Sequence, residues 1–271
     1  MQIIELFEQD IRTNDRQSSK GNQLKWKKNE IWYKADYTGY EGLAETVISG
    51  LLKSSTLASS EFVRYEPVEI RYKTRTFTGV ASEDFLKNGW QIITLERLFR
   101  TFSGASLTET LWQMTSVEDR FLFITDQVER ITHLKDFGEY LNILFTIDAL
   151  FLNEDRHMHN IAVLMNEKGL FDYCPVFDNG AGLLADTTFD YPMDGDLFLL
   201  MDSVKAKTIS ADFDEQLDIS EKICGSNISF SFNRQDVTDI LKTIEIYPEA
   251  QKKRVEDIIA ARMRKYCYLF K

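Results

Sequence analysis

The sequence predicts an α+β fold in which a small β-rich part with one helix precedes a larger helical part. Through residue 87, short segments rich in aromatic and β-branched residues alternate with turn residues, which is typical of strands. From residue 88 to residue 271, apolar residues recur at three-and-four spacing, which is typical of helices with one buried face. We expect the two parts, 1–87 and 88–271, to form separate lobes.

The first part contains two predicted pairs of strands with a helix between them. QLKWKK and EIWYKADY, residues 23–28 and 30–37, flank Asn29 and predict a hairpin. FVRYEPVEIRY and TRTFTGVAS, residues 62–72 and 74–82, predict a second pair. Between the pairs, apolar residues form one stripe at helical spacing, made of Leu43, Ala44, Val47, Ile48, Leu51 and Leu52. This part therefore reads as strands, one helix, and strands again.

The second part contains several predicted helices and one embedded hairpin. The apolar stripes run through residues 93–102, 116–134, 136–153, 233–244 and 248–270. NIAVLMNEKGLFDYCPVFDNG, residues 160–180, predicts two short strands around an Asn-Glu-Lys-Gly turn. Asp155 and Asn160 come just before these strands and Asp178 comes just after them, so we expect the three side chains to lie close together.

The composition argues against nucleic-acid and membrane partners. With 43 acidic and 32 basic residues the formal net charge is -11, which repels phosphate backbones and anionic membrane surfaces. The longest apolar run, residues 141–152, is too short to span a membrane and contains Asp148. Cys174, Cys224 and Cys267 have no paired spacing, which favours a reducing compartment. We expect a cytoplasmic protein, although non-classical secretion leaves no recognisable mark in a sequence.

Two acids and an amide around a hairpin are suited to binding a hard cation. Asp155, Asn160 and Asp178 all offer oxygen ligands, and Mg²⁺ prefers a few protein carboxylates with substrate phosphates completing its coordination. His157 and His159 are two residues apart, but no third ligand cluster accompanies them, so zinc is not expected. The spacing therefore indicates a layout for phosphoryl transfer.

These motifs resemble a known family. D-x-x-x-x-N at 155–160 and D-x-G at 178–180 resemble the catalytic and metal-binding loops of the protein-kinase-like fold. His157, two places after the Asp, is similar to HipA-like bacterial serine/threonine kinases and to phosphoinositide kinases. Three further segments favour the short, CtkA-like form of the HipA-like kinases: SSKGNQLKW at 18–26, WYKADYTGYEGLAE at 32–45 and PVFDNG at 175–180.

The resemblance implies a bilobal protein-kinase-like α+β fold that uses ATP and Mg²⁺ to phosphorylate serine or threonine hydroxyls of a protein. Asp155 would orient and deprotonate the acceptor hydroxyl, and Asn160 and Asp178 would hold Mg²⁺. His157 would reach the γ-phosphate or position the base. Positioning and charge compensation would carry most of the rate.

The resemblance also implies a nucleotide-binding set in the first part. Lys34 looks like the lysine that contacts the α- and β-phosphates, and Glu45 looks like its ion-pair partner, with Glu41 as the alternative partner. Residues 79–86 would connect the lobes and meet the adenine.

A phosphate-covering loop is implied for SSKG, where the backbone around Ser18, Ser19, Lys20 and Gly21 would approach the phosphates closely because Gly lacks a side chain. Alternatively, autophosphorylation of Ser18 or Ser19 would add charge that expels the loop from the nucleotide site.

Two other functions stay open. A phosphoinositide or small-molecule kinase would share D-R-H-x-x-N, and a nucleotide-binding pseudokinase would serve as an interaction module. TTFDYPMDGDLF, after Asp178, adds acids where an anionic lipid would need cations. The short stretch before residue 15 leaves no room for the extra N-terminal subdomain of full-length HipA toxins, which weakens the case for a HipB-like antitoxin partner. The protein substrate is not identified by the sequence.

Overall fold

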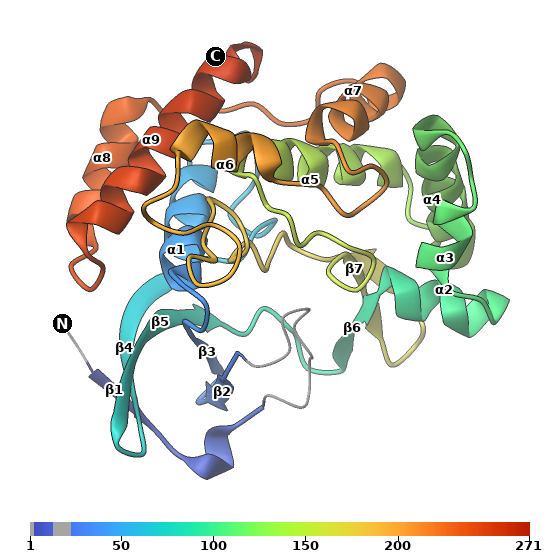
Figure 1. Ribbon diagram of the computed structural model, residues 1–271. Coiled ribbons are helices and arrows are strands. Elements are labelled where there is room, and N and C mark those ends of the chain that lie inside the picture. The colour runs from blue at the N-terminus through green and yellow to red at the C-terminus, as the bar shows by residue number, and fades with distance from the viewer. Residues whose placement is uncertain (1–2, 13–22) are drawn as a thin grey trace. The chain divides into compact units, whose positions relative to one another are not determined.

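The computed structural model describes residues 3–12 and 23–271 (Figure 1). These residues form two compact units that do not follow chain order. The first unit combines Met1–Phe85, Phe177–Ser203 and Phe230–Lys271, and the second combines Leu86–Val176 and Val204–Ser229. The division of the chain into lobes 1–87 and 88–271 is inferred from the sequence pattern alone and stays a prediction.

A curled five-stranded sheet occupies the first unit within the described residues, with the order β1-β4-β5-β3-β2. The strands are β1 (Ile3–Leu6), β2 (Lys25–Lys28), β3 (Ile31–Ala35), β4 (Glu66–Tyr72) and β5 (Arg75–Glu83). The two predicted hairpins, β2–β3 and β4–β5, are confirmed. Strand β1 was not predicted, and it pairs parallel with β4.

The backbone conformation of the turn between β2 and β3 accounts for the Asn found there. Asn29 and Glu30 both have positive φ, 52° and 61°, as the central residues of a tight hairpin turn require. Asn tolerates this left-handed conformation better than most residues do. At the same end of the sheet, where Ile31 pairs with Glu83, β5 continues through Glu83, so residues 79–83 of the predicted connecting segment 79–86 are strand. The boundary between the two units falls after Phe85, within that segment, and its contact with adenine stays a prediction.

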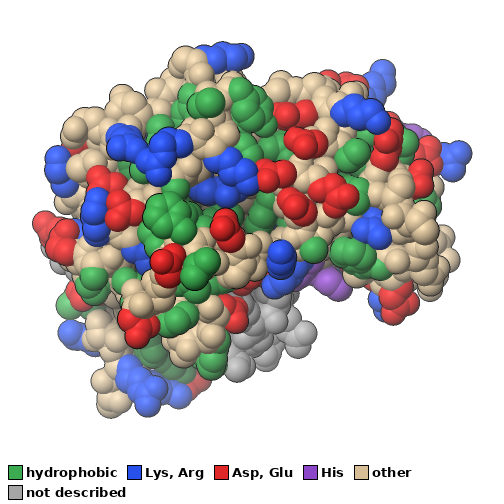
Figure 2. Space-filling view, turned by 45° about the horizontal axis from the view of Figure 1, so that its top comes forward, with side chains coloured by type: hydrophobic (Ala, Val, Ile, Leu, Met, Phe, Trp, Pro, Cys, Tyr) green, Lys and Arg blue, Asp and Glu red, His purple; other side chains and the backbone are tan. Residues whose placement is uncertain are grey.

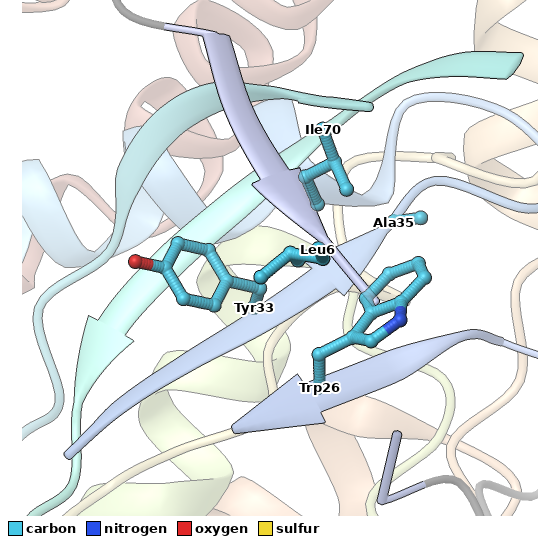
Figure 3. Close-up of a cluster of buried hydrophobic side chains, with 5 residues drawn as sticks. All are labelled: Leu6, Trp26, Tyr33, Ala35 and Ile70. Carbon is cyan, nitrogen blue, oxygen red and sulfur yellow. The ribbon is translucent and has the colours of Figure 1, made fainter. Parts of the chain in front are cut away.

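One face of the sheet buries an apolar cluster made of Leu6, Trp26, Tyr33, Ala35 and Ile70 (Figure 3). Leu6 comes from β1, so the unpredicted strand closes this core. The ring of Trp26 meets Tyr72 edge-on, with centroids 5.4 Å apart, a favoured arrangement of aromatic pairs.

Helices complete the first unit. Helix α1 (Glu41–Leu52) packs against β4, β5 and α8 (Arg234–Thr243), which explains why it is buried on nearly every side. α8 packs in turn on α9 (Glu249–Lys265), and α6 (Leu197–Ser203) also contacts α9. The helix predicted from the stripe Leu43 to Leu52 and the predicted helices at 233–244 and 248–270 are therefore confirmed.

The second unit is mainly helical and has a small sheet of order β6-β7-β8 in the described chain. Its strands are β6 (Trp90–Thr94), β7 (Ala162–Asn166) and β8 (Phe171–Tyr173), and its helices are α2 (Leu95–Ser103), α3 (Leu107–Trp112), α4 (Val117–Thr132), α5 (Phe137–Phe151) and α7 (Phe213–Cys224). The predicted hairpin is β7–β8, with Gly169 at φ 77° in its turn. Helix α2 begins at Leu95, two residues after the start predicted for the helix at 93–102. Ile93 and Thr94 instead end β6, and the Thr94 side chain caps α2.

No helix in the described part of the chain is long and apolar enough to cross a membrane.

Candidate active site

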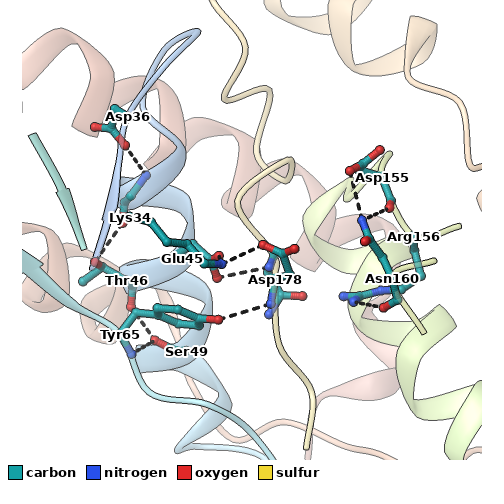
Figure 4. Close-up of polar contacts among 12 residues, drawn as sticks. Lys34, Asp36, Glu45, Thr46, Ser49, Tyr65, Asp155, Arg156, Asn160 and Asp178 are labelled. Carbon is teal, nitrogen blue, oxygen red and sulfur yellow. Dashed lines mark hydrogen bonds and ion pairs between the residues drawn. The ribbon is translucent and has the colours of Figure 1, made fainter. Parts of the chain in front are cut away.

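The first unit places Lys34 between two carboxylates (Figure 4). Its ammonium on β3 lies 2.9 Å from Glu45 Oε1 on α1 and 2.7 Å from Asp178 Oδ1. The side chains are mostly buried, with 14% of Lys34 and 3% of Glu45 exposed. α1 follows β3 after a short loop, which brings Glu45 back over Lys34 despite the short separation in sequence.

The ion pairs decide the charge of this cluster. Burial by itself would lower the pKa of Lys34, but the Asp178 and Glu45 carboxylates outweigh it and raise that pKa well above its ordinary value. Burial raises the pKa of Glu45, and the Lys34 ammonium opposes that shift. Lys34 therefore stays protonated and holds its two acids together.

The structure places the ion pair at Glu45 rather than at Glu41. Glu41 accepts hydrogen bonds from the backbone N–H groups of Thr38 (2.7 Å) and Gly39 (3.2 Å) and from the Thr38 hydroxyl (2.8 Å). It therefore fixes the loop before α1, as an acid near a helix N-terminus commonly does.

Tyr65, which sequence reasoning missed, also belongs to this cluster. Its hydroxyl accepts a hydrogen bond from the Asp178 backbone N–H at 3.3 Å, and its ring centroid lies 5.1 Å from the Lys34 ammonium. Its own backbone N–H donates to Ser49 Oγ on α1 at 3.2 Å. The adjacent Asn179 N–H donates to Glu45 Oε2 at 3.1 Å, so the backbone after β8 is tied to α1.

The second unit places Asp155, His157 and Asn160 in the loop after α5. Asn160 Nδ2 donates to Asp155 Oδ2 at 3.0 Å and to the Asp155 carbonyl at 2.8 Å (Figure 4). His157 Nε2 lies 3.7 Å from Asp155 Oδ1. Burial lowers the pKa of His157 and outweighs the Asp155 carboxylate, which would raise it. The lowered pKa favours a neutral His157 ring.

A buried ion pair holds this loop. Arg156 donates from Nε to Asp148 Oδ2 and from Nη2 to Asp148 Oδ1, both at 3.1 Å, and the Arg156 and Asp148 side chains are 2% and 0% exposed. Arg156 Nη1 also donates to the Asn160 carbonyl at 3.3 Å. Asn153 Nδ2 donates to Asp148 Oδ1, and the Thr208 hydroxyl donates to the Arg156 carbonyl. Arg156 is therefore a structural residue.

Asn160 in the second unit and Asp178 in the first unit each offer an oxygen ligand of the kind that Mg²⁺ prefers. The Asn160 Nδ2 group donates hydrogen bonds to Asp155, so Asn160 Oδ1 is the atom that could bind a cation. Asp178 offers a carboxylate. In the described residues no group of three or more His, Cys, Asp or Glu side chains could hold a metal.

The predicted phosphate loop lies outside the described residues, and this applies to Ser18, Ser19, Lys20 and Gly21.

The comparison with solved structures gives the fold. The crystal structure of the Helicobacter pylori proinflammatory kinase CtkA matches with a TM-score of 0.64 at 17% identity, over 97% of this chain and 95% of that one. This chain has the CtkA kinase fold. The CtkA-like resemblance and the predicted bilobal protein-kinase-like α+β architecture are confirmed at the level of the fold.

Other comparisons add less to the CtkA-like fold. HipA of Shewanella oneidensis MR-1, in a complex with HipB and operator DNA, matches with a TM-score of 0.47 at 12% identity, over 94% of this chain and 66% of that one. No protein-family model and no curated protein sequence matches. The chemistry of this CtkA-like chain therefore rests on its own side chains.

Proposed function

We propose that this chain is an ATP-dependent protein kinase that transfers the γ-phosphoryl group of Mg·ATP to a serine or threonine hydroxyl. The observation that carries the proposal is the contact of Lys34 with both Glu45 and Asp178. A buried lysine held by a helix glutamate next to a D-x-G carboxylate is the arrangement that kinases use to grip phosphates and metal.

Asp155 is the proposed base for the acceptor hydroxyl. Its carboxylate is held by Asn160 and lies beside His157. The His159 N–H donates to His157 Nδ1 at 3.2 Å, so a neutral His157 ring carries its proton on Nε2, the nitrogen near Asp155. We assign His157 to positioning Asp155 through this N–H.

Asn160 and Asp178 are the proposed magnesium ligands. Mg²⁺ held there would supply positive charge that offsets the charge of the transferred phosphoryl group. Lys34 would contact the α- and β-phosphates, with Glu45 holding it in place. The backbone at 18–21 would cover the phosphates, and Ser18 or Ser19 is the proposed autophosphorylation site.

A lipid substrate is less well supported. The chain from Ala181 to Ser203 carries five aspartates and no lysine or arginine. An inositol phosphate headgroup needs cations near the transfer site, and this stretch supplies the opposite charge. Protein hydroxyls are therefore the better acceptors.

Transfer of labelled phosphate tests the function. Purified chain, γ-labelled ATP, Mg²⁺ and a cell lysate should give labelled protein, and Asp155→Asn should reduce labelling by roughly 10²- to 10⁴-fold. Asp172→Asn, an exposed acid on β8, is the matched control and should label as wild type does. Circular dichroism and nucleotide titration verify that Asp155→Asn is folded and binds ATP.

Two results would argue for other functions, and a third would end the autophosphorylation proposal. Labelling of phosphoinositide vesicles but of no lysate protein would favour a lipid kinase. Nucleotide binding without any transfer under Mg²⁺ or Mn²⁺ would favour a pseudokinase. An unmodified 18–19 peptide, by mass spectrometry of an active sample, would end the autophosphorylation proposal.

A further inference from the structure

Exposed apolar side chains gather in the segment that follows Asp178. Phe189, Phe198 and Leu199 are 70%, 62% and 70% exposed, and Met193 is 39% exposed. Hydrophobic side chains reach the surface among charged ones on the face drawn in Figure 2. Single exposed apolar residues are ordinary, but four within eleven positions indicate a contact surface.

Local hydrogen bonds hold this segment in place. The Asp186 carboxylate accepts the Phe189 N–H at 3.0 Å, and the Tyr191 N–H donates to the Asp186 carbonyl at 2.8 Å. Tyr191 itself is buried, 6% exposed. The apolar side chains are therefore presented by an ordered turn, so binding to them costs less ordering entropy.

The second half of the segment is equally well bonded. The Gly195 N–H donates to the Pro192 carbonyl at 3.2 Å. The Asp196 carboxylate accepts hydrogen bonds from the N–H groups of Phe198 and Leu199, each at 3.0 Å. Asp196 directly precedes α6, which begins at Leu197. Phe198 and Leu199 thus lie on a capped helical turn.

A buried arginine supports the turn from α9. Arg254 is 7% exposed, and its Nη1 donates to the Pro192 carbonyl at 2.9 Å and lies 3.4 Å from Met193 Sδ. Its Nε and Nη2 are buried without a hydrogen-bond partner in the described structure. Burying a guanidinium in this way is costly. The side-chain hydrogen bonds of Arg254 in the described structure go to Pro192 and Met193, in the exposed segment.

The charge of the segment selects the partner. The exposed acids are Asp190, Asp194, Asp196 and Asp202, and no basic residue lies between Ala181 and Ser203. Anionic lipid would be repelled, whereas lysine or arginine side chains would be attracted. Exposed apolar side chains that alternate along the chain with exposed acids match a segment that carries apolar residues flanked by basic ones.

We infer that residues 187–203 form a docking surface for an apolar and basic segment of a substrate protein. The 187–203 surface begins shortly after Asp178, so the inference rests on the proposed kinase function and gives its substrate class. The apolar residues of the partner bind to Phe189, Met193, Phe198 and Leu199, and the exposed aspartates of the same segment select lysine and arginine.

Peptide binding tests the surface without any phosphoryl transfer. The probe is a short fluorescein-labelled peptide that alternates arginine with leucine and phenylalanine around one serine, and its counterpart has glutamate in place of arginine. By fluorescence anisotropy without nucleotide, the basic peptide should bind at least about tenfold more tightly, with binding weakened by salt. The double variant Phe198→Ser, Leu199→Ser should weaken binding roughly tenfold.

Controls separate this inference from the kinase function. Leu170→Ser, 61% exposed in the β7–β8 turn, should bind as wild type does. Asp194→Asn with Asp202→Asn should reduce the salt dependence. Asp155→Asn should bind the peptide normally, so peptide binding without any transfer would remove the kinase function and leave the surface standing.

Three outcomes would overturn the inference: equal binding of both peptides, no effect of Phe198→Ser with Leu199→Ser, or a wild-type dimer in sedimentation that this double variant abolishes. The last result would identify a second copy of the chain as the occupant.

Discussion

The ammonium of Lys34 lies 2.7 Å from a carboxylate oxygen of Asp178. In the proposed function, one of these groups contacts phosphates and the other binds Mg²⁺. Each therefore compensates the other's charge before the nucleotide arrives, which limits the cost of burying them. Binding of Mg·ATP would exchange this ion pair for contacts with metal and phosphate.

Replacing Lys34 with methionine should reduce phosphoryl transfer by roughly 10²-fold or more, because a cation aimed at the phosphates is lost. The same change leaves Glu45 and Asp178 as two acids without their cation, so the pKa of the Glu45 carboxyl should rise further. Transfer rates measure the first effect, and urea denaturation at several pH values measures the second. Lys53→Met, on an exposed lysine after α1, is the control, and an equal loss there would contradict a specific role for Lys34.

Tyr65 should act as a positioning residue for both Lys34 and Asp178. Tyr65→Phe keeps the ring near Lys34 but removes the hydroxyl that accepts the Asp178 N–H. We expect it to cost about 1 kcal/mol of transition-state stabilisation, and we expect Tyr65→Leu to cost more because the cation–π contact is lost as well.

The measurement is kcat and the KM for ATP of both variants beside their melting temperatures. A purely structural role would lower the melting temperature of each variant and leave the kinetic constants of the folded fraction unchanged.

Arg156→Met should lower the free energy of unfolding by about 3–5 kcal/mol, because it leaves the buried Asp148 carboxylate without its cation. Urea denaturation measures the change. Arg130→Met, which breaks the exposed pair with Asp126, is the matched control and should change stability by less than about 1 kcal/mol. Similar losses in the two variants would contradict the special cost of the buried pair.

Sequence reasoning reaches the elements whose signals are local. α1 is predictable from its apolar stripe, and the β7–β8 hairpin from its Asn-Glu-Lys-Gly turn. The family resemblance predicts the Lys34–Glu45 pair but leaves Glu41 open as the alternative partner. The structure distinguishes them because Glu41 is used by the loop before α1.

Features that depend on distant parts of the chain were missed. Tyr65 meets Asp178 across 113 positions, and no periodic pattern marks such a contact. β1 is four residues long and pairs with β4, with Ile3 opposite Glu69, so its partner is not visible locally. β6 runs directly into α2 at Leu95, and its apolar residues merge with the helical stripe. In each case long-range packing, rather than local propensity, decides the structure.

Asp36 should make stability depend on pH. It lies at the end of β3 and accepts hydrogen bonds from the Gly42 N–H (2.6 Å), the Thr78 hydroxyl and the Tyr247 hydroxyl (both 2.7 Å). Burial, reinforced by Glu41, raises the pKa of Asp36 from 3.8 to about 6. The folded state therefore holds the proton more tightly than the unfolded chain does.

The stabilisation from protonated Asp36 is complete below pH 3.8 and is lost as the pH rises through about 6, a change of roughly 3 kcal/mol. Asp36→Asn stays neutral and can keep these hydrogen bonds, since its Oδ1 accepts the Gly42 N–H and its amide donates to the hydroxyls. The variant should gain stability relative to wild type as the pH rises from about 4 to about 7. Urea denaturation at several pH values measures this difference, and parallel curves for the two proteins would show that Asp36 does not titrate in this range.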